Sequence, residues 1–78
     1  MTAIATIKKN SREELRVTLD EFRGHHLVNV RVFYDAGDGE MKPGKQGIAV
    51  KVELLRELLA ALDAAEKSAR QAGLLEAA

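Results

Sequence analysis

The stretch LVNVRVFY, residues 27–34, decides the fold, because its residue types alternate with a period of two. One side of the alternation is entirely valine, at Val28, Val30 and Val32. The other side carries Asn29, Arg31 and Phe33. A period of two together with β-branched residues indicates a β-strand with one apolar and one polar face.

The flanking residues extend this strand into a sheet. LRVTLDEF (15–22) also alternates, and Gly24 supplies a turn between the two runs. DAGDG (35–39) contains the Asp-Gly pair that is typical of hairpin loops. We expect two further short strands, EMK (40–42) and GIAVK (47–51). Pro43 lacks an N–H for the strand ladder, so it marks a strand end or an edge, and we interpret Pro43-Gly44 as a tight turn.

From Val52 the apolar spacing changes to three and four, which is the period of one helical face. The repeating apolar positions are Val52, Leu55, Leu58, Leu62, Ala65 and Ala69. Gly73 is a suitable C-terminal stop. The predicted fold is therefore α+β: a four-stranded antiparallel sheet, curved, followed by one long C-terminal helix (β-β-β-β-α). We expect the helix to cover one sheet face.

The predicted organisation is a single domain. Residues 1–13 form an N-terminal arm that is either flexible or a short strand, 14–72 the domain, and 73–78 a C-terminal tail. At 78 residues without cysteine, the chain has a small core and no disulfide to reinforce it. A helix of about 20 residues is about 30 Å long, more than short strands can cover. We expect a homodimer, with an interface at Leu55, Leu58, Leu59 and Leu62.

The sequence argues against several function classes. It has no Gly-rich phosphate loop, no Ser-His-Asp set and no cysteine nucleophile, and adjacent carboxylates such as Glu13 and Glu14 point to opposite faces of a strand. We therefore expect that the protein is not an enzyme. Two adjacent histidines, His25 and His26, are too few for a metal site, and no cofactor is expected. No apolar run could cross a membrane, so we expect a cytoplasmic protein, nucleoid-associated in a bacterium.

Cations and aromatic residues gather in the predicted sheet, although the formal net charge is zero. They include Phe22, Arg23, Arg31, Tyr34, Lys42 and Lys45. Single-stranded nucleic acid needs this mixture, because cations follow its phosphates and aromatic rings stack on its unpaired bases. Two simpler interpretations stay open at this point. Phe22 and Phe33 could be core residues, and the lysines could be solvated turn residues.

Three segments resemble one known family, the transcriptional coactivator positive cofactor four and its short bacterial relatives. They are LDEFRGHHLVNVRVFY (19–34), DGEMKPGKQGIAV (38–50) and the amphipathic helix after them. The resemblance covers residues 15–62. It implies a dimer whose curved sheets bind single-stranded DNA with little sequence preference. The role it implies is that of a coactivator-like regulator of transcription or a handler of unwound DNA, in contact with the transcription machinery.

The resemblance also implies which residues contact DNA. Phe22 falls on a stacking phenylalanine and Tyr34 on a tryptophan position, while His25 falls where a lysine is usual. The other implied contacts are basic: Arg23, Arg31, Lys42 and Lys45. Outside the segment that the resemblance covers, Lys8 and Lys9 are further candidates for phosphate contact. Strict alternation places Arg31 with Phe33 rather than with Tyr34. If Arg31 and Tyr34 both contact DNA, their strand must bulge or twist near its end.

Two alternatives to DNA binding remain. The first is single-stranded RNA, because no residue type here would accept or reject a 2′-hydroxyl. The second is a protein-interaction module that has lost DNA binding, for which Leu74 and Leu75 are the only hint.

Overall fold

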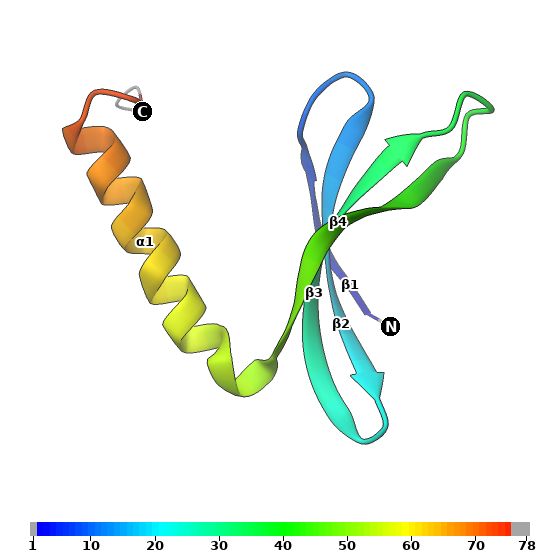
Figure 1. Cartoon of the computed structure of the whole chain (residues 1–78), viewed down its shortest axis with the longest axis horizontal. Helices are drawn as coiled ribbons and strands as arrows, with labels where there is room; N and C mark the ends of the chain where they lie inside the picture. The colour runs from blue at the N-terminus through cyan, green and yellow to red at the C-terminus, as the bar shows by residue number, and fades with distance from the viewer. Residues whose placement is uncertain (1, 76–78) are drawn as a thin grey trace.

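The computed structural model describes residues 2–75, which form one antiparallel sheet followed by a helix. The strands are β1 (Thr2–Lys8), β2 (Glu13–Phe22), β3 (His25–Asp35) and β4 (Met41–Lys51). A 3₁₀ turn, η1 (Val52–Leu54), leads into α1 (Leu55–Gln71). The strands lie in chain order, β1-β2-β3-β4, so each connection is a hairpin (Figure 1). The predicted β-β-β-β-α fold is confirmed.

The four strands are not the four that the sequence suggested. Residues 2–8 of the N-terminal arm form β1, which pairs with β2. The two short strands expected at 40–42 and 47–51 are parts of a single strand, β4. The expected break between them is wrong because β4 lies at the sheet edge, where Pro43 needs no N–H for a second neighbour.

Instead of a turn, β4 contains a bulge. Arg31 pairs with Gly47 and Phe33 pairs with Pro43, so residues 44–46 together lie opposite Val32. The predicted Pro-Gly turn is therefore wrong, and the chain reverses at residues 36–40 instead. There the N–H of Ala36 donates to the carbonyl of Glu40 at 3.2 Å.

The β2–β3 hairpin has a two-residue loop. Phe22 pairs with His25, and the residues between them both have positive φ, 53° at Arg23 and 81° at Gly24. Two positive φ angles are the signature of a type I′ turn, whose twist matches that of the flanking strands. The predicted turn at Gly24 is confirmed, with Arg23 as its first central residue.

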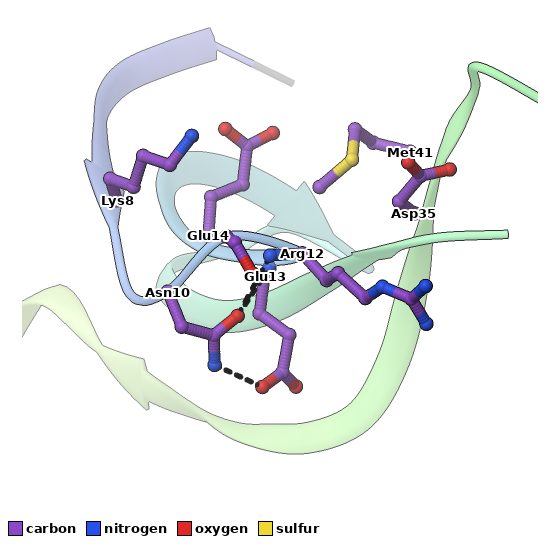
Figure 2. A pocket seen from close by; sticks show the side chains of 8 residues that line it. Lys8, Asn10, Arg12, Glu13, Glu14, Asp35 and Met41 are labelled. Atoms are coloured by element: carbon purple, nitrogen blue, oxygen red, sulfur yellow. Dashed lines mark hydrogen bonds between the residues drawn. The ribbon is translucent and has the colours of Figure 1, made fainter. Parts of the chain in front are cut away.

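Asn10 organises the β1–β2 connection. Its Oδ1 accepts hydrogen bonds from the N–H groups of Arg12 and Glu13, both at 2.9 Å, and its Nδ2 donates to Oε1 of Glu13 at 2.7 Å. Hydrogen bonds from Asn10 and Lys9 hold the pKa of the Glu13 carboxyl below its ordinary value. Figure 2 shows these groups around a small hollow that also borders Asp35 and Met41. The hollow is a by-product of the turn.

Cross-strand register gives the sheet one apolar face. Leu15, Val17 and Leu19 of β2 pair with the three valines of β3, and residues directly opposite each other point to the same side. We call the surface formed by these six residues the apolar face. Within residues 2–75 only Val28 and Val32 are buried among the hydrophobic residues, at 6% and 7% exposure. Leu15, Val17 and Val30 are half-buried and Leu19 is exposed, so the apolar face is only partly covered in a single chain.

The helix does not cover that face, contrary to expectation. Figure 1 shows α1 leaving the end of β4 and projecting away from the sheet. In the described chain the apolar face receives the helix only at its start, where Leu55 lines a hollow with Val17, Leu19 and Val28. The period of α1 was predicted correctly, but its partner surface was not. A repeating apolar face shows that a helix needs a partner, and it does not say which one.

The helix ends as the sequence suggested. Gly73 has a φ of 75°, its N–H donates to the carbonyl of Arg70, and the N–H of Leu74 donates to that of Ala69. This pair of bonds is a Schellman motif. No side chain caps the N-terminus of η1 or of α1. Within residues 2–75 no helix is long and apolar enough to cross a membrane. The predicted tail, 73–78, is described as far as residue 75, and its remainder lies outside the described residues.

Candidate nucleic-acid interface

The second sheet face is polar and carries part of the predicted site. Since β2 and β3 pair in continuous register, alternate residues of both strands share this side. We call this surface the polar face and define it by Arg16, Thr18, Asp20, Phe22, His25, Asn29, Arg31 and Phe33. A groove of about 270 Å³ runs along it, bordered by Pro43 of β4.

Two arginines meet at the centre of the polar face. Arg16 of β2 and Arg31 of β3 are directly opposite each other. The Arg16 guanidinium lies 4.1 Å from the centre of the Phe33 ring and bonds Glu14 at 2.7 Å. Arg31 donates from Nη1 to the carbonyl of Gly44 at 3.1 Å, in the β4 bulge. Like charges directly opposite destabilise a sheet, and an anion between them relieves the repulsion. The pair can therefore receive a phosphate.

An aromatic ring is presented at the β2–β3 hairpin. Phe22 is 60% exposed, and the guanidinium of Arg23 lies 5.2 Å from its ring centre. His25 is the register partner of Phe22 on the same face. An exposed ring beside cations can stack on a base while the cations meet the neighbouring phosphates. Phe22 is thus not a core residue, and Phe33 is half-buried beneath Arg16.

The remaining predicted contacts lie on the other side of β3. Tyr34 pairs with both Glu13 and Lys42, and these three residues continue the apolar face rather than the polar one. Tyr34 borders the bulge together with Gly44 and Lys45. β3 keeps its register with β2 through Tyr34, so the expected bulge lies in β4 and not in β3. The structure places Phe22, His25 and Arg31 on one face, where Phe22 and His25 pair at the hairpin and Arg31 lies six residues further along β3. It places Tyr34, Lys42 and Lys45 in a second group.

Sequence reasoning missed Arg16. Its position on the polar side of an alternating run was visible, but its opposition to Arg31 depends on the register of β2 against β3. The two lysines named as further candidates differ in their surroundings. Lys8 pairs with Glu14 across β1 and β2, and Lys9 forms an ion pair with Glu13 at 3.0 Å.

The helix carries the four predicted interface leucines. Leu59 and Leu62 are both 58% exposed, and Leu55 and Leu58 are half-buried. Across residues 2–75 no group of three or more histidine, aspartate or glutamate residues is arranged to hold a metal ion.

A small curved sheet with a cationic, aromatic face and a trailing helix defines a class of nucleic-acid-binding fold. Comparison with family models assigns the chain within it: the Transcriptional Coactivator p15 (PC4) family matches residues 9–61, and the chain belongs to this family. The family resemblance in the sequence is confirmed.

Individual relatives agree with this assignment. The RNA polymerase II transcriptional coactivator SUB1 of Saccharomyces cerevisiae is 45% identical over 58 residues, which are 73% of this chain and 18% of that protein. The chain thus spans about a fifth of that relative's length. A PC4 homolog from Burkholderia pseudomallei, BPSL1147, superposes with a TM-score of 0.77 at 31% identity, covering 83% of this chain and 88% of that one. A MoSub1–single-stranded DNA complex superposes with a TM-score of 0.65 at 32% identity, covering 92% and 83%.

Proposed function

We propose that this protein binds single-stranded DNA with little sequence preference and acts as a coactivator-like regulator of transcription or a handler of unwound DNA, without enzymatic activity. The observation that carries the proposal is the polar face. Its two adjacent strands, β2 and β3, together present the Arg16–Arg31 pair and the exposed Phe22 ring. Membership of the p15 (PC4) family and the likeness to the MoSub1 complex support it. Contact with the transcription machinery is proposed from the yeast relative's identity as a coactivator.

The chemistry of the polar face favours single strands over duplex. Arg16 and Arg31 supply charge for phosphates, and Phe22 supplies a ring that stacks on an unpaired base, worth about 1–3 kcal/mol per base. In a duplex the base faces are stacked on each other, and only the base edges are accessible in the grooves. The second group, Tyr34, Lys42 and Lys45, lies at the far end of the β3–β4 ribbon. Under this proposal it contacts a more distant part of the strand.

The proposal includes a homodimer. In a single chain the apolar face is only partly covered, and two of the α1 leucines, Leu59 and Leu62, are each 58% exposed. Exposed apolar surface of this extent is typical of an association site. A second copy of the chain supplies matching surfaces, because its helix is apolar on one side and its sheet is apolar on one face.

The test is fluorescence anisotropy with labelled oligothymidine of about 20 nucleotides, longer than the roughly 4–16 nucleotides that one small single-strand-binding fold occupies. We expect salt-sensitive binding that unlabelled single strands displace and duplex of equal length does not. RNA of matching sequence serves as a second competitor, and stronger displacement by RNA would make RNA the ligand. No binding at low salt would contradict the proposal and favour a protein-interaction role.

A further inference from the structure

The polar face holds a carboxylate where a phosphate-binding surface would be expected to hold only cations. Asp20 lines the same groove as Arg16, Arg31 and Phe33. None of the ion pairs within residues 2–75 includes Asp20, although Arg16 and Arg31 border the groove. A carboxylate repels phosphates, so its position calls for a ligand group other than phosphate.

Two neighbouring side chains fix the orientation of this carboxylate. The hydroxyl of Thr18 donates to Oδ2 of Asp20 at 3.0 Å, and Nδ2 of Asn29 donates to the same oxygen from β3. No hydrogen bond from the described residues reaches Oδ1 of Asp20. Because the Nδ2 group of Asn29 is the donor in this contact, the Oδ1 atom of Asn29 is a second acceptor beside the Asp20 carboxylate. The cluster therefore offers acceptors to the groove.

The cluster lies within reach of a stacked base. Asp20 and Phe22 are two residues apart on the same side of β2, a spacing of about 7 Å along a strand. A base that stacks on Phe22 can thus direct its edge toward Asp20. Hydrogen-bond acceptors select donors, and the exocyclic amino groups of cytosine, adenine and guanine are donors. Thymine carries the carbonyl oxygen O4 where cytosine carries its amino group, and its single donor on that edge, N3–H, lies between two carbonyl oxygens that a carboxylate repels.

We propose that Asp20, oriented by Thr18 and Asn29, forms a base-selective subsite that prefers bases with exocyclic amino groups over thymine. This inference rests on the proposed function and deepens it. Binding stays tolerant along most of the strand, because the phosphate contacts and ring stacking are common to all bases. The subsite adds a bias at one position of each bound strand.

The test compares oligomers that differ only at the selected groups and have the same length of about 20 nucleotides as in the binding assay above. Oligo-deoxycytidine is compared with oligo-deoxyuridine, and oligo-5-methyldeoxycytidine with oligothymidine, so that the methyl group is matched within each pair. The pH is held above neutral to keep cytosine unprotonated. We expect each cytosine oligomer to bind about three- to tenfold more tightly than its partner, the size expected from the net contribution of one ordinary hydrogen bond.

Two variants test whether the preference for cytosine comes from Asp20. Asp20→Asn keeps the shape and supplies a donor as well as an acceptor, so the ratio of the two affinities should fall to about one. Glu21→Gln makes the same charge change on the same strand but on the opposite face, and should leave the ratio unchanged.

The outcomes separate this inference from the proposed function. Equal affinity of the unaltered protein for both members of each pair would overturn the subsite and leave single-strand binding intact. So would an unchanged ratio in Asp20→Asn. If the unaltered protein binds none of the four oligomers, the proposed function and the subsite both fail. Because the first comparison uses the unaltered protein, it does not depend on either variant folding.

Discussion

At the scale of single residues, Arg23 has an unfavourable backbone conformation, but its side chain lies at the candidate nucleic-acid interface. Its φ of 53° lies in the left-handed region, which costs a non-glycine residue about 1 kcal/mol or more. In exchange its guanidinium lies beside the exposed ring of Phe22. Backbone strain at such a place points to a functional constraint. The same turn built for stability alone would carry asparagine before Gly24.

We expect Arg23→Asn to stabilise the fold and weaken DNA binding. Asparagine tolerates the left-handed region, so the free energy of unfolding should rise by about 0.5–1 kcal/mol. Loss of the cation should lower affinity for oligothymidine. Urea denaturation and anisotropy measure the two effects. Arg12→Asn is the control for charge, and equal binding by the two variants would remove Arg23 from the interface.

At the scale of elements, the bulge in β4 shapes the polar face. It places the carbonyl of Gly44 where Arg31 donates to it at 3.1 Å, which holds this side chain near Arg16. Gly47 allows the strand to return to register beside Arg31, because a Cβ there would lie 2.6 Å from the carbonyl oxygen of Val30. Relieving this contact requires backbone atoms to move, which costs more free energy than moving a flexible side chain.

We expect Gly47→Ala to destabilise the β3–β4 pair by about 1–3 kcal/mol, as overpacking does in other tightly packed sites. The clash involves backbone on both strands, so relief requires β4 to separate from β3. Thermal denaturation measures the loss, and hydrogen exchange of the β3 and β4 amides locates it. Gln46→Ala, one residue earlier and exposed, is the control and should cost less than 0.5 kcal/mol. Equal stability of both variants would show that the bulge tolerates a side chain at 47.

At the scale of the whole molecule, the main feature is that α1 is separated from most of the sheet. α1 meets the sheet only near Leu55 within the described chain and then projects away from it (Figure 1). None of the α1 residues is buried. A single chain thus leaves two apolar surfaces without a partner, and a second copy can cover both.

If the protein forms the proposed homodimer, we expect Leu62→Asp to convert it to a monomer. Leu62 is 58% exposed in the single chain, so the substitution costs little there, whereas a charge buried at an interface without a partner is strongly destabilising. Analytical ultracentrifugation over a concentration series measures the change. Ala64→Asp places the same charge on the opposite side of the helix and should remain dimeric. A dimeric Leu62→Asp protein would place the interface elsewhere.

The two groups of cations should differ in their share of DNA binding. Each phosphate contact contributes about 0.7 to the slope of log affinity against log salt for single strands. Alanine at both Arg16 and Arg31 should therefore lower the slope by about 1.4, by the same relation. Alanine at both Lys42 and Lys45 tests the second group in the same assay. An unchanged slope for either double variant would exclude that pair from phosphate contact.

Much of the local geometry follows from the amino-acid sequence, with the Pro43-Gly44 segment of β4 as the exception. The alternation around Val28, Val30 and Val32 specifies a strand because a period of two matches the pleat, and the three-four spacing after Val52 specifies a helix. Gly24 and Gly73 mark chain reversals because they tolerate positive φ. The family resemblance followed from residues 19–34 and 38–50 and is confirmed.

The contacts between these elements depend on the tertiary structure. The opposition of Arg16 to Arg31, the bulge opposite Val32 and the placement of Tyr34 away from Arg31 all follow from strand register. Register depends on contacts between residues distant in sequence, and no local pattern encodes it. The direction of α1 is likewise set by which apolar surface it meets. An apolar stripe on a helix shows that this side of the helix must be buried. It does not show which apolar surface will cover it, and in this protein a single chain does not supply that surface.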